Sequence, residues 1–243
     1  MALTPLEMFN GTLSLLCVSI STLVGLIIIS KYPKYKQKNL IFVGISWIGI
    51  FSPWWPSSIS FLVALITGTG LTPTLYFLIG FIVSPVVLII WMWAFTDLAF
   101  KNQQKIIVGI YAIIGIAFEI YLVYYLFIVN EPGVIGDLNG ILDATYRGVA
   151  ILYSIFIVLT MLITGILFGR ESLKSDDPEI RLKGKLLILA FVLWVVGAIM
   201  DAALPLEIIT LTLARLILIF SAISFYCGFL LPGVVKKIFL KEN

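Results

Sequence analysis

Histidine is absent from the 243 residues of the sequence, and this absence removes several classes of chemistry at once. Histidine is the commonest protein ligand for metals and the usual general base near neutral pH. Haem ligation by histidine, zinc-protease catalysis and Ser-His-Asp catalysis are therefore excluded. We accordingly expect a protein that is not an enzyme and that carries no metal and no cofactor.

Cysteine is nearly absent as well, with Cys17 and Cys227 as the two examples. Both fall inside long apolar stretches, they lie far apart in the sequence, and neither belongs to a Cys-x-x-Cys pair. This placement is typical of reduced cysteines that act as small apolar side chains, with a disulfide or a metal site as the alternative.

Charged residues are scarce too, at 12% of the sequence, whereas 61% of the residues are hydrophobic. Soluble domains carry roughly 25% charged residues. Apolar stretches of about 20 residues recur between short polar loops, which is the length that crosses roughly 30 Å of hydrocarbon as a helix. Lipid satisfies no backbone polar group, and the stretches lack the alternation of barrel strands. The sequence therefore predicts an all-α, polytopic membrane helix bundle, with the lipid bilayer as its first partner.

Seven spans follow from the apolar stretches, in a single transmembrane domain over residues 1–243. We place them at about 9–29, 39–52, 74–100, 106–129, 150–168, 186–204 and 208–231. The apolar segment 58–67 is too short to cross alone, so it is a re-entrant helix, an interfacial helix or a kinked continuation of the second span. Because proline interrupts helices, we expect Pro53, Pro56 and Pro85 to bend the second and third spans.

The residues before the first span argue against a cleavable signal peptide. Met1 to Asn10 include Glu7 and contain no lysine or arginine. A signal peptide begins with a positively charged region, so we expect the first span to remain in the mature protein.

The distribution of positive charge predicts the orientation of the bundle, because cytoplasmic loops close to span ends carry an excess of lysine and arginine. With the N-terminus outside, all of the sixteen lysines and arginines except Arg147 and Arg215 fall in cytoplasmic loops or in a cytoplasmic C-terminal tail. The net charge of +3 therefore reflects sidedness rather than a nucleic-acid surface. We expect a multi-pass protein of the cell membrane that binds no nucleic acid.

Three ionisable residues inside or beside the spans are the candidate ligand-binding residues. A charge at the bilayer centre costs at least about 2.5 kcal/mol unless it is paired or hydrated. Glu119 lies near the middle of the fourth span, Asp201 near the outer end of the sixth, and Arg215 about two turns inside the seventh. They form either a ligand-binding charge cluster in the outer half of the bundle or a permanent ion pair that fixes helix register, or Arg215 reaches outward to water.

Two further patterns at span ends are interpreted as structural. Asp97 and Lys101 have the spacing of an i, i+4 ion pair at the cytoplasmic end of the third span. Gly165 and Gly169 form a GxxxG pattern at the inner end of the fifth span, which is suited to close helix contact.

Seven spans also suggest a retinal-binding protein, in which retinal is bound covalently to a lysine in the middle of the last span. The seventh span contains Arg215 and no lysine before Lys236, which follows the helix-ending Pro232. We therefore expect no covalent retinal.

A faint internal repeat links the starts of the second and sixth spans. Asn39-Leu40 leads to Trp47-Ile48-Gly49, and Lys185-Leu186 leads to Trp194-Val195-Val196-Gly197. Two parallel units of three helices, joined by the fourth helix, would produce such a repeat, and this 3+1+3 layout occurs in transporters and in seven-helix receptors. Chance similarity of Leu, Ile and Trp at span ends is the alternative.

Several segments also resemble known membrane modules. Trp47 in the second span, Pro85 followed by Trp91 and Phe95 in the third, and the basic segment 181–185 before the sixth resemble the seven-helix module at the N-terminus of many archaeal and bacterial sensor histidine kinases. Pro53-Trp54-Trp55-Pro56 and Phe168-Gly169-Arg170-Glu171-Ser172 look similar to segments of uncharacterised archaeal multipass membrane proteins. The residues after Gly233 contain no phosphoacceptor histidine and no ATP-binding domain. The resemblance therefore implies a sensor that passes its signal to a separate protein, and it assigns no ligand residues.

These observations lead to one functional prediction with two alternatives. We predict a stand-alone seven-helix sensor or receptor-like protein that signals through its cytoplasmic loops, with the charged segment from Arg170 to Lys185 as the contact surface for a membrane or cytoplasmic protein partner. That segment could equally be a solvated connection beside anionic lipid. The alternatives are a small secondary transporter of 3+1+3 layout with a polar site at midplane, and a structural or assembly subunit of a membrane complex.

Overall fold

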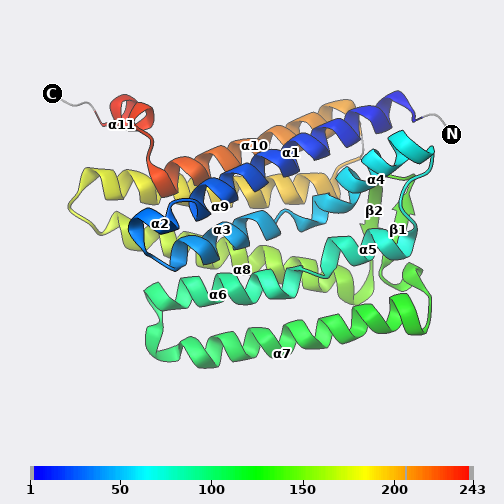
Figure 1. Cartoon of the computed structure of the whole chain (residues 1–243), viewed down its shortest axis with the longest axis horizontal. Coiled ribbons are helices and arrows are strands. Elements are labelled where there is room, and N and C mark those ends of the chain that lie inside the picture. Colours follow the sequence, from blue (N-terminus) through cyan, green and yellow to red (C-terminus); the bar gives the residue numbers. More distant parts are fainter. Residues whose placement is uncertain (1–2, 206, 241–243) are drawn as a thin grey trace.

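The structure, a computed structural model, describes residues 3–205 and 207–240; Lys241, which the orientation argument assigns to the tail, lies outside them. Within the described residues, seven helical segments are long and apolar enough to cross a membrane. They lie side by side, and α1 starts at the end of the bundle opposite to the one where α10 finishes (Figure 1). The predicted all-α bundle is confirmed, and the protein is a multi-pass membrane protein.

The helices follow one another in the order that the apolar stretches predict. The first three spans are α1 (Pro5–Ile29) with the short α2 (Tyr32–Tyr35), then α3 (Asn39–Gly49) with α4 (Trp55–Thr67), then α5 (Pro73–Phe81) with α6 (Ser84–Ala99). The others are α7 (Gln104–Val123), α8 (Gly148–Leu173), α9 (Pro178–Ala203) and α10 (Ile208–Leu230), and a short α11 (Gly233–Phe239) follows. A π-helical turn, Tyr124–Ile128, extends α7.

Polar residues beside proline start several of these helices. Thr4 forms a capping box with Glu7 at the start of α1, so each satisfies a backbone N–H of the other. The side chains of Thr72 and Asp177 each accept a hydrogen bond from a backbone N–H in the first turn of α5 and α9, and each is followed by a proline at the first helical position. The local sequence therefore determines where these spans begin.

Two spans are broken near the same place. In the second span a 3-10 turn, Ser52–Trp54, separates α3 from α4, and in the third span a turn separates α5 from α6 before Pro85. Both breaks contain a Ser-Pro pair, and the hydroxyl oxygens of Ser52 and Ser84 lie 3.2 Å apart. The proline bends are therefore present, and the two breaks are bonded to each other.

The segment 58–67 lies within α4, which continues the second span beyond its break. Together the two helices form one apolar segment, Asn39–Thr67, long enough to cross the membrane. Of the three placements that the sequence left open, the helix bounds agree with the kinked continuation. Helix therefore continues past residue 52, the predicted end of this span, to Thr67.

Two helix pairs cross in the same manner, α1 with α3 and α8 with α9. A Cβ added at Gly25 would lie 2.7 Å from the carbonyl oxygen of Gly44, and one added at Gly169 would lie 2.9 Å from that of Gly184. In both pairs, the isoleucine four residues after the second glycine also packs against the first glycine. Ile48 packs against Gly25, and Ile188 packs against Gly169. Glycine is thus required for two equivalent close approaches, in the first and in the second half of the chain.

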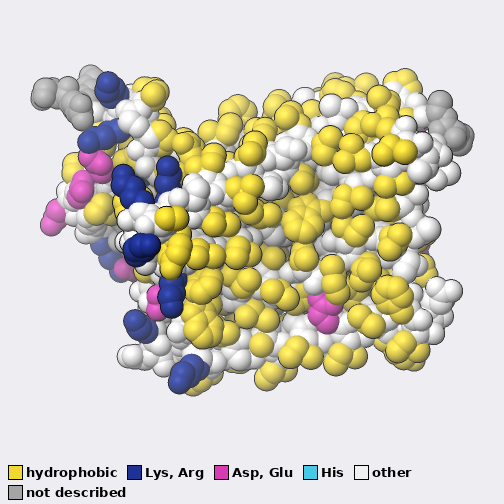
Figure 2. Space-filling view, viewed as in Figure 1, with side chains coloured by type: hydrophobic (Ala, Val, Ile, Leu, Met, Phe, Trp, Pro, Cys, Tyr) yellow, Lys and Arg dark blue, Asp and Glu magenta, His cyan; other side chains and the backbone are white. Residues whose placement is uncertain are grey.

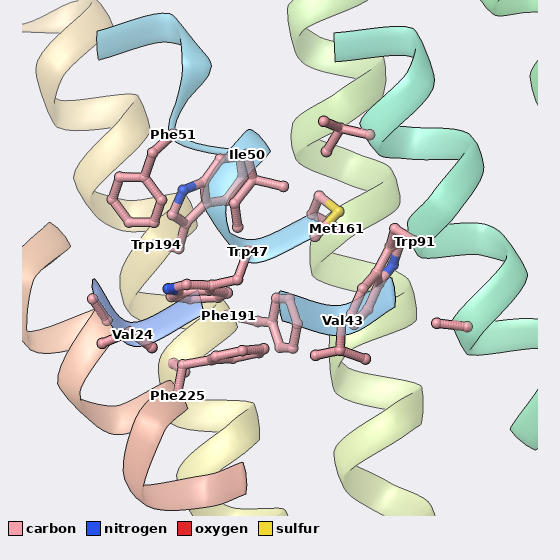
Figure 3. Close-up of a cluster of buried hydrophobic side chains, with 14 of the residues drawn as sticks. Val24, Val43, Trp47, Ile50, Phe51, Trp91, Met161, Phe191, Trp194 and Phe225 are labelled. Carbon is pink, nitrogen blue, oxygen red and sulfur yellow. The ribbon is translucent and has the colours of Figure 1, made fainter. Parts of the chain in front are cut away.

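Aromatic rings fill the centre of the bundle. Trp47 from α3 stacks on Phe225 from α10, with ring centroids 3.6 Å apart, and Phe191 from α9 meets Trp47 and Trp91 edge-on or tilted (Figure 3). Trp47, Trp91, Phe191 and Phe225 are almost completely buried. This layer, here called the aromatic layer, joins helices of both halves of the chain.

The fourth span lies at one edge of the bundle. In Figure 1 α7 forms the lower rim, and it packs mainly against α6. Its contact is close at Gly115, where an added Cβ would lie 2.9 Å from the Cβ of Pro85. Ile106, Ile113 and Ile120 are exposed, as expected for side chains that face lipid.

The two ends of the bundle differ in charge. Lysine and arginine gather at the end formed by the loops before α3, α7 and α9 and by α11, and we call it the basic end (Figure 2). At the opposite end, a hairpin of β1 (Gly136–Asn139) and β2 (Asp143–Tyr146) connects α7 to α8. We call it the hairpin end. The hairpin was not predicted, although Gly140, at φ 73° in the three-residue connection after Asn139, is a residue typical of turns.

Candidate functional site

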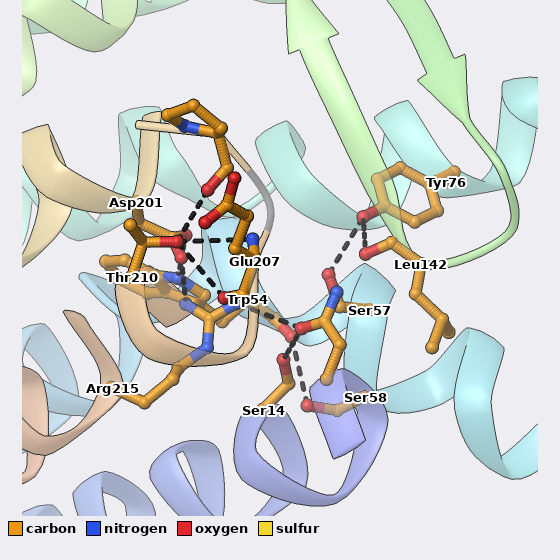
Figure 4. A network of polar contacts seen from close by, with 12 residues as sticks. Ser14, Trp54, Ser57, Ser58, Tyr76, Leu142, Asp201, Glu207, Thr210 and Arg215 are labelled. Carbon is orange, nitrogen blue, oxygen red and sulfur yellow. Dashed lines mark hydrogen bonds and ion pairs between the residues drawn. The ribbon is translucent and has the colours of Figure 1, made fainter. Parts of the chain in front are cut away.

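Arg215 is the centre of a buried polar cluster near the hairpin end. Its side chain is 3% exposed, and its Nη1 lies 2.8 Å from Oδ1 of Asp201. The other carboxylate oxygen of Asp201 accepts a 2.7 Å hydrogen bond from Nε1 of Trp54 (Figure 4). The guanidinium also lies 5.8 Å from the ring centroid of Trp54. An ion pair therefore joins α9 to α10 and attaches both to the break in the second span.

The first span completes this cluster. Nη2 of Arg215 donates to Oδ1 of Asn10 over 3.4 Å, and the Ser14 hydroxyl donates to the same oxygen over 3.1 Å. Nε of Arg215 has no hydrogen-bond acceptor within the described residues. We name these five residues the arginine cluster: Asn10, Ser14, Trp54, Asp201 and Arg215.

The arginine cluster is closed. A small crevice beside it, lined by residues such as Asp201, Pro205 and Thr210, has room for about one water molecule. The ion pair between Asp201 and Arg215 is present as the sequence suggested, and the contacts favour its structural interpretation, because protein groups occupy both side chains.

Glu119 is not part of the arginine cluster. It lies on α7, at the far edge of the bundle, and its carboxylate makes no contact with Asp201 or Arg215. The sequence could not exclude the contact, because depth in the membrane does not determine which helices are neighbours. The three predicted residues therefore do not line one pocket.

A second group of hydrogen bonds ties the hairpin to the broken spans. The Tyr76 hydroxyl lies 2.8 Å from Oγ of Ser57 and donates to the carbonyl oxygen of Leu142 over 3.0 Å (Figure 4). Ser60 donates to the carbonyl oxygen of Ile141 over 2.6 Å. The loop between the two strands thus seals the bundle beside the arginine cluster.

Tyr146, at the end of β2, lies in the same region. Burial raises the pKa of its hydroxyl, and the negative charges of Asp201 and Asp143 raise it further. Its ring packs against Phe81 with centroids 4.7 Å apart. The hairpin thus contributes an uncharged aromatic side chain to the seal.

The basic end contains a cavity with a volume of about 470 Å³. Helices of both halves line it, with polar side chains at its mouth and apolar ones deeper. The lining residues are Gln37, Lys38, Asn39, Leu40, Val43, Asp97, Leu98, Phe168 and Phe229. Phe168 also contacts Trp91 of the aromatic layer, so this layer lies directly beyond the cavity.

Asp97 organises the mouth of this cavity. It accepts a 3.1 Å hydrogen bond from Nδ2 of Asn39, and its other oxygen lies 3.7 Å from Nζ of Lys101, which is the i, i+4 contact predicted. The sequence did not reveal the cavity, because its residues come from four different helices. The polar Gln37-Lys38-Asn39 stretch beside Asp97 was the available signal.

Comparison with known proteins adds no relative. The chain matches no protein-family model, no curated protein and no solved structure. The assignment of function therefore depends on the geometry alone.

Proposed function

We propose that this protein is a small membrane carrier of 3+1+3 layout, in a conformation open toward its basic end. The observation that carries the proposal is the contrast between the two ends of one interface. Helices of both halves separate at the basic end to leave the cavity, and helices of both halves are bonded together at the hairpin end. Alternating access requires such a pairing of one open and one closed end.

The broken spans support the same proposal. Discontinuous helices in transporters occur beside the substrate path, where they free backbone groups and act as hinges. Here the Ser-Pro breaks of the second and third spans lie between the cavity and the hairpin end, and Ser52 contacts Ser84 there. The matched glycine crossings of α1 with α3 and of α8 with α9 support two equivalent helix units.

We orient this carrier with the basic end in the cytoplasm and the start of α1 outside, in the cell membrane. The support is the concentration of lysine and arginine in the loops of the basic end. In this orientation the cavity opens to the cytoplasm.

A sensor remains the second candidate, and the aromatic layer favours it. Apolar ring contacts run from Phe225 through Trp47 and Phe51 to Trp54 of the arginine cluster. A receptor needs no polar path through these rings. In that case the cavity mouth or the segment from Arg170 to Lys185 would contact a signalling partner.

Cysteine labelling in lipid nanodiscs separates the two candidates, because a water-soluble maleimide then reaches both ends. Cys17 is a native reporter, since it is 1% exposed and lies on α1 one turn beyond Ser14 of the arginine cluster. Phe168→Cys reports on the cavity. All variants carry Cys227→Ser, and those with Phe168→Cys also carry Cys17→Ser.

Asp201→Asn should weaken the seal at the hairpin end. For a carrier we expect labelling of Cys17 to become at least tenfold faster while labelling of Phe168→Cys becomes slower, because opening one end closes the other. Lys174→Gln, at the exposed ion pair with Glu171, is the matched control and should change neither rate. Faster labelling at both positions, or no change at either, contradicts the carrier and leaves the sensor.

A further inference from the structure

Glu119 on α7 is an acidic residue that has no role in the carrier proposed above. It lies in the middle of the fourth span and is half-buried against its neighbours. Its Oε1 is buried and has no hydrogen-bond partner in the described residues. Figure 2 shows an acidic side chain surrounded by hydrophobic ones in the middle of the apolar surface.

Tyr153 of α8 supplies a second buried polar group without a partner. Its side chain is 5% exposed, and its hydroxyl makes no hydrogen bond within the described residues. Its ring stacks on Phe118, the residue before Glu119, with centroids 3.8 Å apart and planes 9° from parallel. This stack brings Tyr153 against the turn of α7 that carries Glu119.

The helices around this pair bring no compensating charge. On α6 the charged residue is Asp97, which lies at the basic end, and Arg170 and Glu171 of α8 are also at that end. On α7 itself, Lys105 lies fourteen residues before Glu119, which is roughly 20 Å along the helix. The neighbouring tyrosines are occupied: Tyr111 contacts Thr160, and Tyr121 donates to a backbone carbonyl.

We infer that Glu119 and Tyr153 form a proton-binding site between α7 and α8 in the apolar middle of the membrane. The carboxylate takes a proton from water and returns it when the pair becomes hydrated, so no other ion or co-reactant is needed. The protonated carboxyl has an O–H donor, and the Tyr153 hydroxyl of the facing helix is a buried polar group without a hydrogen-bond partner in the described residues. The inference rests on the proposed carrier, in which the site would couple proton movement to the exchange between the two open states.

A continuous set of contacts links this site to the broken spans. Gly115, one turn before Glu119, packs against Pro85 at the break between α5 and α6. Ser84, the residue before that proline, contacts Ser52 at the other break. A change in hydration or position at Glu119 is therefore passed to both breaks through packed side chains.

The first test is chemical. Dicyclohexylcarbodiimide adds to protonated carboxyl groups in apolar surroundings to give a stable N-acylurea, which mass spectrometry detects as an added mass. With the full protein in nanodiscs, we expect Glu119 to be modified at neutral pH, with the rate falling at least tenfold as the pH is raised to 9. Glu119→Gln should carry no modification in this peptide, and Tyr153→Phe should shift the pH dependence without abolishing the reaction.

The second test links the site to the conformation. At each pH the labelling rate of Phe168→Cys, in the same Cys17→Ser and Cys227→Ser background, is divided by the rate of the unfolded protein to remove the pH dependence of the thiol itself. This ratio should depend on pH when Glu119 is present and should become constant in Glu119→Gln. An unmodified Glu119, or a modification rate that is constant from pH 6 to 9, overturns the proton site even if the Asp201→Asn experiment supports a carrier. If Glu119 reacts as expected but Asp201→Asn produces no opposed labelling, the carrier fails and the carboxyl is a proton site without transport.

Discussion

The hairpin end and the basic end are built from the same helices but are held in different ways. At the hairpin end, directional contacts hold the bundle closed: Trp54 and Asn10 of the first half bond to the ion pair of the second half, and hydroxyl groups bond to the hairpin. At the basic end the helices diverge around a cavity whose polar groups are near water. From this comparison we expect a polar contact to stabilise the bundle more when its groups are more deeply buried. The most deeply buried polar groups lie at the hairpin end, where the bundle is closed.

The largest effect is expected from Asp201→Ala. This change leaves Arg215 buried and without its counter-charge, which typically costs about 3–5 kcal/mol. The free energy of unfolding, measured by helical circular dichroism during a titration from mild detergent into sodium dodecyl sulfate, should fall by that amount. Asp97→Ala at the basic end removes an exposed pair and should cost less than about 1 kcal/mol. Equal losses for the two variants would remove the proposed difference between the ends.

An intermediate effect is expected at the glycine crossings. Gly25→Ala and Gly169→Ala each place a Cβ against a backbone oxygen of the neighbouring helix, and overpacking of this kind costs about 1–3 kcal/mol. The same unfolding titration measures it. Gly109→Ala is the control, because nothing lies within 4 Å of an added Cβ and alanine favours the helix. If the two crossings are equivalent, their losses should agree within about 1 kcal/mol.

The smallest effect is expected from Tyr76→Phe, which removes the hydroxyl bonded to Ser57 and to the carbonyl oxygen of Leu142. The loss of stability should be about 1–2 kcal/mol, because the partner groups are left unsatisfied. Amide hydrogen exchange in the strands 136–139 and 143–146 should become faster, whereas exchange in α9 should not change. Unchanged exchange in the hairpin would show that this bond does not hold it.

The sequence predicted the helical class and the seven spans because span length and hydrophobicity are local properties. It also predicted the bends at Pro53 and Pro85, since proline acts on its own helix. The sequence also predicted the pairing of Arg215 with Asp201, because both residues lie near the same end of consecutive spans. It could not tell that Glu119 faces a different side of the bundle, because a span's neighbours are set by packing.

The cavity and the hairpin show the same limit in different ways. The cavity depends on four helices that diverge, so no single segment carries its signature. The hairpin had a local signature in Gly140, but four-residue strands between polar loops are easily missed. The role of Trp54 as a donor to Asp201 could not be predicted either, because the two residues lie 147 positions apart in the sequence.

The bonds between the hairpin and the early spans have a consequence for biosynthesis. Ser60 and Tyr76 find their partners in residues 81 and 66 positions later in the chain, beyond the whole of α7. While the ribosome is still making α7, these two hydroxyls therefore lack their acceptors in the hairpin loop. Sealing of the hairpin end is thus a late event in synthesis, which requires the loop before α8.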